Sequence, residues 1–384
     1  EIEPQLGTME QFIDLINAAT SYGIEIALDI AFQCSPDHPY LKRFPQWFSY
    51  RPDGSIQCAE NPPKRYEDIV PFNFETESWQ MLWEELRGVL FFWIEKGVRI
   101  FRVDNPHTKP FPFWKWVLRE VKVQYPDTIF LSEAFTRPKI MYHLAKTGFS
   151  QSYTYFTWRN TKKEITDYFN ELTNPPVSDF FRPNLWPVTP DILPEYLQFG
   201  GENAFAVRLI LASMLSPSYG IYGPLFEYAV NTAIDGREEF LDSEKYQIRH
   251  WNLRTDLHLS KLIKSVNTIR KENQALKELT NLQFCEIDND YLLSFIKKTA
   301  DKTNVILVVV NLDPFHPQSG TIEIPLSELG IGAGQPYLLD DLLSDERFLW
   351  SGRSNSITVD PAVRPGFILS IQTVIQREKD YDYF

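Results

Sequence analysis

Apolar positions at helical spacing alternate with short, almost wholly apolar runs over the first half of the chain. Residues 9–22 carry an amphipathic helical pattern behind the capping-box pair Thr8 and Gln11. Gly23 ends this predicted helix, and residues 24–30 are typical of a strand buried on both faces of a parallel sheet. The same alternation predicts helices over 77–96 and 114–124 and strands over 98–103, 128–132, 150–155, 180–184 and 218–222.

Repeated strand–helix units predict a (β/α)8 TIM barrel, whose active site lies at the carboxyl ends of its strands. Six strands are predicted, so the first two should precede the chain start, and the initial Glu1 in place of Met fits an N-terminally truncated protein. A cleaved leader would explain the same start. An open doubly wound sheet would need a glycine-rich phosphate turn, which the sequence lacks.

Two regions depart from this alternation. Residues 32–74 are rich in Pro, Asp and Asn without a clear period, which predicts a loop-rich insertion. After a predicted helix over 258–276 the pattern becomes all-β, with strands expected over 291–296, 304–310, 321–324 and 367–371. We therefore predict a partial barrel over residues 1–279 and a C-terminal β-sandwich over 280–384.

The composition argues against several classes of function. The 384 residues include 51 acidic and 38 basic side chains, and a net charge of −13 argues against a nucleic-acid or anionic-membrane surface. Three cysteines without CxxC spacing and six histidines without metal-binding spacing predict no disulfide framework, metal or cofactor. Because no apolar stretch reaches a membrane span and no signal pattern begins the chain, we expect a cytoplasmic protein.

Acidic residues end two successive predicted strands. Side-chain alternation places Arg102 and Asp104 on one face of the strand over 98–103, and Glu133 follows the next strand. A guanidinium favours an ionised neighbouring carboxylate, and paired carboxylates are what glycoside cleavage requires. Asp191 follows the next strand but one as a third acid. Such acids can instead cap the following helices, but three at successive strand ends favour the catalytic interpretation.

Three longer segments carry a specific resemblance: FRVDNPHTKP, FLSEAFTRPKIMYHLAKTGFSQSYTYFTWRN and FFRPNLWPVTPDIL. With them the chain resembles the α-amylase superfamily, and closely its maltosyltransferase family. The resemblance implies a retaining enzyme on a (β/α)8 barrel with a C-terminal β-sandwich. By it, Asp104 is the nucleophile, Glu133 the general acid/base and Asp191 the transition-state stabiliser. Val188 stands where close relatives are expected to have Asn.

The same resemblance implies a maltose 1-phosphate donor and an α-1,4-glucan acceptor, as in glycogen-like α-glucan synthesis, and a homodimeric full-length protein. Phosphate leaves the donor, so an anion pocket is needed. The matching substrate-binding positions are Gln33, Asn61, Tyr66, Arg102, Asn105, Lys245 and Tyr246. Without the resemblance, Lys245 reads as a solvated charge, and Asn61 and Tyr66 as turn residues.

Two other functions use the same features. A hydrolase or disaccharide isomerase of the superfamily would carry the same three acids and differ in what captures the intermediate. A non-catalytic barrel scaffold, as in the heavy chains of amino-acid transporters, is the alternative outside enzymes. The three acids and the absence of an apolar membrane span from the sequence oppose the scaffold.

Overall fold

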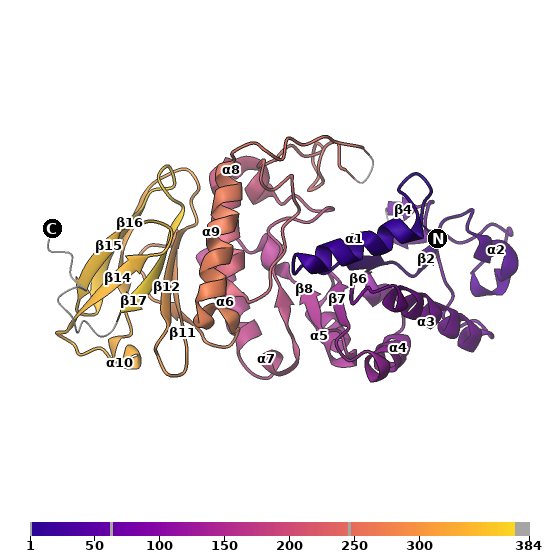
Figure 1. Ribbon diagram of the computed structural model, residues 1–384, viewed down its shortest axis with the longest axis horizontal. Helices are drawn as coiled ribbons and strands as arrows, with labels where there is room; N and C mark the ends of the chain where they lie inside the picture. The colour runs from indigo at the N-terminus through magenta and orange to yellow at the C-terminus, as the bar shows by residue number, and fades with distance from the viewer. Residues whose placement is uncertain (1, 62–63, 245–246, 373–384) are drawn as a thin grey trace. The chain divides into compact units, whose positions relative to one another are not determined.

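The computed structural model describes residues 2–61, 64–244 and 247–372. These residues form two compact units. The first holds the chain up to residue 153 together with residues 180–182, and the second holds residues 154–179 and the chain from residue 183 onward. Figure 1 shows the helices and strands of both and labels many of them.

The first unit is built on a parallel sheet. Its strands lie in the order β1 (Ala27–Ile30), β6 (Ile100–Asp104), β7 (Ile129–Glu133) and β8 (Gln151–Tyr153). Phe101 and Phe130, from neighbouring strands, stack in the core with ring centroids 5.4 Å apart. The alternate residues of β6, which include Arg102 and Asp104, face the other way and are only partly buried. The alternation predicted for residues 98–104 is confirmed.

Amphipathic helices cover the apolar face of this sheet (Figure 1). These are α3 (Trp79–Glu95), α4 (Phe111–Gln124) and α5 (Pro138–Thr147). In α3 the buried side chains recur every four residues from Leu82 to Ile94. The helix α1 (Met9–Ser21) begins with the predicted capping box of Thr8 and Gln11, which is confirmed. The first predicted strand is shorter than expected, because residues 24–26 do not pair.

Residues 32–74 contain only short elements. They are α2 (Pro39–Arg43), β2 (Gln33–Cys34), which pairs with β5 (Val70–Pro71), and the hairpin of β3 (Ala59–Asn61) and β4 (Lys64–Tyr66). A cluster of aromatic rings holds this segment together. Trp47, at its centre, is completely buried and contacts the rings of Tyr40 and Phe44.

The second unit begins with helices packed around one buried helix. Its elements before the β region are α6 (Lys162–Thr173), α7 (Val177–Phe180), β9 (Pro183–Asn184), α8 (Glu195–Leu215) and α9 (His258–Glu272). Every residue from Ala204 to Leu215 in α8 is buried. The strand predicted over 218–222 is wrong: this segment makes only an isolated bridge from Tyr219 to Leu185. The helix predicted to residue 276 ends at Glu272 and continues as a short 3₁₀ turn.

The C-terminal region is an antiparallel β domain. A six-stranded sheet has the order β10 (Leu282–Cys285), β11 (Leu292–Lys298), β12 (Val305–Asn311), β17 (Gly366–Gln372), β14 (Pro336–Asp341) and β15 (Arg347–Ser351). A second sheet pairs β13 (Gln318–Glu323) with β16 (Ser354–Val359). Every residue of β12 is buried, because α8 packs on one face and the apolar core shared with β13 lies on the other. The four strands predicted here are confirmed, whereas β10, β14, β15 and β16 were not predicted.

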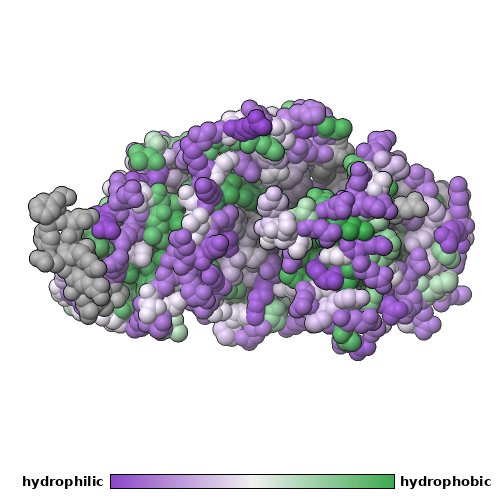
Figure 2. Space-filling model, in the orientation of Figure 1, coloured by the Kyte–Doolittle hydropathy of each residue, from purple (hydrophilic) through white to green (hydrophobic). Residues whose placement is uncertain are grey.

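The surface is mainly polar. Hydrophilic side chains cover most of the face that Figure 2 shows. Among the described residues, no helix combines the length and the apolar character that crossing a bilayer requires.

Candidate active site

The two strand-end carboxylates of the first unit are neighbours across the sheet. The parallel register pairs Asp104 of β6 with Glu133 of β7, and it pairs Arg102 with Asp29 of β1. Register partners in a sheet point to the same face. Asp104 and Glu133 therefore form an outer layer at the carboxyl ends of the strands, with Asp29 and Arg102 one layer below.

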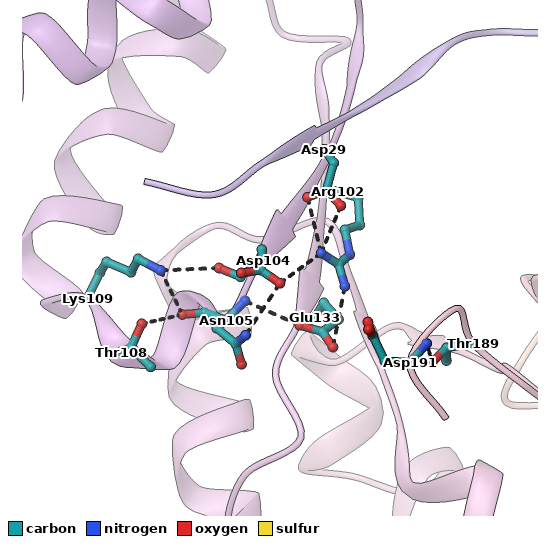
Figure 3. Close-up of polar contacts among 9 residues, drawn as sticks. All are labelled: Asp29, Arg102, Asp104, Asn105, Thr108, Lys109, Glu133, Thr189 and Asp191. Carbon is teal, nitrogen blue, oxygen red and sulfur yellow. Dashed lines mark hydrogen bonds and ion pairs between the residues drawn. The ribbon is translucent and has the colours of Figure 1, made fainter. Parts of the chain in front are cut away.

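Arg102 joins these carboxylates into one cluster (Figure 3). Its Nη1 lies 2.9 Å from Asp29 Oδ2 and 2.9 Å from Asp104 Oδ1, and its Nη2 lies 3.4 Å from Glu133 Oε1. Burial alone would lower the pKa of Arg102, but Glu133, Asp29 and Asp104 outweigh it and raise that pKa. The guanidinium is therefore permanently charged and holds the two outer carboxylates in place.

A tight turn follows Asp104. Asn105 adopts the left-handed conformation, with φ 43° and ψ 53°. Its backbone N–H donates to Glu133 Oε2 over 3.3 Å, and its side-chain amide donates to Asp104 Oδ1 over 3.4 Å. The 3₁₀ helix Pro106–Thr108 begins at the next residue. The turn thus connects both acids through one residue.

Beneath the turn lies a buried lysine. Lys109 is 7% exposed, and its Nζ lies 3.4 Å from the carbonyl oxygens of both Asp104 and Asn105. Burial lowers the pKa of Lys109 to about 8, although Asp104 and Glu133 oppose the shift. Burial, followed by the nearby Lys109, also lowers the pKa of His107.

Tyr153 completes the polar cluster from the end of β8. The side chain is 5% exposed, and it is a hydrogen-bond partner of Arg102. Burial raises the pKa of Tyr153 to about 12, so its hydroxyl keeps its proton at neutral pH.

Three other predicted site residues lie on short strands of the loop-rich segment over 32–74. Gln33 is half-buried in β2, Asn61 is the last residue of β3, and Tyr66, the last of β4, is 37% exposed. Lys245 and Tyr246 lie outside the described residues. Of the seven predicted substrate-binding residues, the carboxylate cluster contains Arg102 and Asn105.

Asp191 belongs to the second unit. Its backbone N–H donates to Thr189 Oγ1 over 3.2 Å (Figure 3), within a short turn closed by a bridge between Thr189 and Ile192. Val188, where the resemblance leads one to expect Asn, is completely buried in the apolar core of this unit. An apolar side chain packs there in place of the polar contact.

Three residues of the cluster were not predicted as site residues: Asp29, Lys109 and Tyr153. Asp29 had a signal in the sequence, because it is an acid near the carboxyl end of the apolar run over 24–30, which also contains Glu25. Nothing in the sequence indicates that Lys109 belongs to the site, because a lysine in a proline-rich polar segment is typical of a solvated loop. Within the described residues, no group of three or more His, Cys, Asp or Glu side chains is arranged to hold a metal ion.

Comparisons with known proteins identify relatives of this chain. A family model described as "GLGE, C-terminal" matches residues 284–371. The alpha-1,4-glucan:maltose-1-phosphate maltosyltransferase of Methylacidiphilum infernorum (isolate V4) is 53% identical over 371 residues, which are 96% of this chain and 56% of the relative. That of Chlorobaculum tepidum is 49% identical over 376 residues, with the same coverage. The chain spans about half the length of these curated relatives.

Solved structures show the fold. The alpha-amylase from Geobacillus thermoleovorans, complexed with acarbose, superposes with a TM-score of 0.76 at 14% identity, covering 97% of this chain and 82% of that one. A maltogenic alpha-amylase from Thermotoga neapolitana gives a TM-score of 0.74 at 17% identity, covering 96% and 83%. The fold is that of α-amylases, which confirms the predicted class of a (β/α)8 barrel followed by an antiparallel β domain.

Proposed function

Because this chain belongs to the α-1,4-glucan:maltose-1-phosphate maltosyltransferase family of the α-amylase superfamily, we propose that it transfers maltosyl units from maltose 1-phosphate to the non-reducing ends of α-1,4-glucans. The observation that carries the proposal is the register pairing of Asp104 with Glu133 at the carboxyl ends of adjacent parallel strands. Identity near one half over almost the whole chain supports the donor and the acceptor.

The spacing of the two acids favours a retaining mechanism. Both carboxylates contact the one guanidinium of Arg102, Asp104 at 2.9 Å and Glu133 at 3.4 Å, so they lie close together, and retaining glycosidases hold their two carboxyl groups about 5–5.5 Å apart. Inverting enzymes need a wider gap to admit a water molecule. Asp104 is therefore close enough to attack the sugar on which Glu133 acts.

In the first step, an oxygen of Asp104 forms a bond to the anomeric carbon as the bond from that carbon to the phosphate oxygen breaks. Arg102 and Asn105 both donate to Oδ1, which orients the carboxylate and leaves Oδ2 to attack. The phosphate leaves with the bonding electron pair and takes a proton from Glu133. In the second step, Glu133 removes the proton from the 4-hydroxyl of the glucan end, which displaces Asp104 from the covalent β-maltosyl intermediate.

The remaining predicted residues complete the proposal. Asp191 stabilises the positive charge that develops on the sugar ring. Gln33, Asn61, Tyr66, Lys245 and Tyr246 hold the donor; Lys245 supplies charge to the phosphate and the others supply neutral hydrogen bonds. The domain boundary near residue 280, a cytoplasmic setting, glycogen-like synthesis and a homodimer stay predictions from the sequence.

Phosphate release from maltose 1-phosphate by the purified protein, expressed at its full natural length, tests the proposal. We expect release that depends on an added maltooligosaccharide, which grows by one maltosyl unit as read by mass spectrometry. Asp104→Asn should lower kcat about a thousandfold or more. Asp127→Asn, which changes an exposed acid of the same unit, is the control and should leave kcat unchanged.

Other outcomes reject the assignment. Release at the same rate without glucan, with free maltose as product, identifies a hydrolase that uses the same two acids. No release from folded protein rejects the phosphate donor, and stoichiometric sugar binding without turnover would favour a scaffold.

A further inference from the structure

The turn at residues 104–105, which contacts both catalytic carboxylates, is hydrogen-bonded to one buried ammonium group, that of Lys109. The carbonyl oxygens of Asp104 and Asn105 both lie 3.4 Å from Lys109 Nζ. Within the described residues, these two carbonyls are the hydrogen-bond acceptors of that ammonium. Thr108 Oγ1 also donates to the Asn105 carbonyl, over 2.8 Å (Figure 3).

The turn needs such support. The left-handed region is unfavourable for most residues other than glycine, although asparagine enters it more readily than most, and Asn105 adopts it directly after the nucleophile. The same residue presents its N–H to Glu133. A rotation of the peptide group after Asp104 or after Asn105 would both redirect the Asp104 carboxylate and break the hydrogen bond from the Asn105 N–H to Glu133.

A buried lysine is energetically unfavourable if its only role is to fill space. Burying an ammonium group carries a desolvation penalty that an apolar side chain of similar length avoids. Its donors face the turn, and the residue as a whole is 7% exposed. A packing role does not require donors at this point.

We propose that Lys109 is a positioning residue, which holds the 104–105 backbone so that Asp104 is aimed at the anomeric carbon while Asn105 keeps its hydrogen bond to Glu133. The proposal rests on the proposed function, since it concerns the same reaction. It predicts that loss of the ammonium slows formation of the glycosyl–enzyme bond in molecules that are otherwise folded and complete.

Trapping of the intermediate separates that effect from a loss of folded protein. With 5-fluoro-α-maltosyl fluoride, an oxygen of Asp104 forms a bond to the anomeric carbon, the C1–F bond breaks, fluoride leaves, and the slow second step leaves a covalent adduct. Mass spectrometry then gives both the rate constant and the final occupancy. In Lys109→Met we expect full occupancy, a rate constant at least about tenfold lower, and a KM for maltose 1-phosphate within about twofold of the wild-type value.

Matched variants sharpen the experiment. Lys122→Met removes a partly buried lysine of α4 that donates to Ser150 instead, and it should trap at the wild-type rate. Lys109→Gln keeps an uncharged NH₂ donor group, so its rate constant should fall between those of Lys109→Met and wild type. It replaces Lys109→Met if that variant folds poorly.

Two results overturn the proposal. One is a wild-type rate constant in both Lys109 variants, and the other is reduced occupancy in which the reactive fraction still traps at the wild-type rate. A wild-type protein that forms no adduct on Asp104 overturns the proposed function itself, and this proposal with it.

Discussion

Arg102 shows how one side chain can organise three acids. Its planar fork reaches Asp29, Asp104 and Glu133 from a single point. Without a cation between them, these carboxylates would repel one another and lose their common orientation. A lysine at the same position would carry a compact charge without the planar set of donors of a guanidinium. It could not contact all three carboxylates in the same geometry.

We therefore expect Arg102→Lys to lower kcat/KM by about a hundredfold and the free energy of unfolding by about 1–3 kcal/mol. Steady-state kinetics and urea denaturation measure the two effects. Arg99→Lys is the control, because Arg99 donates to the backbone carbonyls of Ile94 and Val98 rather than to acids. Equal activity in Arg102→Lys and wild type would show that charge alone is sufficient.

Lys109 should also make stability depend on pH. Its pKa in the folded protein is about 8, chiefly because it is buried, whereas a lysine in an unfolded chain titrates near about 10.4. Between these values the unfolded chain binds more protons, so the contribution of Lys109 to stability rises with pH. Below pH 8 both states carry the proton, and the penalty for burying the charge is fully present.

The free energy of unfolding of wild type, minus that of Lys109→Met, should thus be constant below about pH 7 and rise by up to about 3 kcal/mol by about pH 10.5. Urea denaturation at intervals across this range measures the difference, in which other titrations cancel. Lys115→Met, at an exposed position of α4, is the control. A difference that falls as pH rises would contradict the prediction.

The strands and the turn after β6 determine different features of the site. The β6–β7 pairing brings the two acids to one level, and β1 adds Asp29 beside Arg102. The turn after β6 then decides the direction of the Asp104 carboxylate, because Asn105 leaves the strand in the left-handed region. A rigid sheet sets the spacing of the acids, while a short strained segment sets their aim.

This division predicts different results for two replacements of Asn105. Glycine adopts the left-handed region freely, whereas a β-branched residue pays about 1–2 kcal/mol there. Both variants lose the long amide contact to Asp104. Asn105→Val should therefore be at least about tenfold less active than Asn105→Gly in phosphate release. Equal activities would mean that the side chain, rather than the backbone conformation, is what the site needs.

The chain as a whole carries a charge that opposes its proposed donor. A net charge of −13 repels an anionic sugar phosphate, and salt screens this repulsion over about 10 Å at about 0.1 M. Lys245, the cation proposed to hold the phosphate, acts at closer range. The long-range field and the local site therefore work in opposite directions.

Raising potassium chloride from about 10 mM to about 100 mM should increase kcat/KM for maltose 1-phosphate about twofold. The uncharged donor α-maltosyl fluoride provides the control, and its kcat/KM should not change. A steady fall for the phosphate donor would show that nearby cations, rather than the net charge, dominate the encounter.

Local patterns in the sequence determined much of this protein. The alternation over residues 98–104 placed Arg102 and Asp104 on one face, because side chains of any strand alternate. The capping box at Thr8 and the helical stripe of α3 are likewise set by residues close in the chain. The repetition of such units indicated the α/β fold, and the strand-end acids indicated the chemistry.

Tertiary structure decided what depends on distant partners. Asp29 joined the site because β1 pairs with β6, across more than seventy residues. Residues 218–222 became a single bridge, and β14–β16 formed from segments with weak local signals, because strands gain their hydrogen bonds only from a neighbour. Lys109 resembled a surface charge until the turn after β6 buried its ammonium beneath two carbonyls. Periodicity acts over a few residues, whereas pairing and burial are set by contacts between segments far apart in the chain, and for that reason only folding assembled the cluster around Arg102.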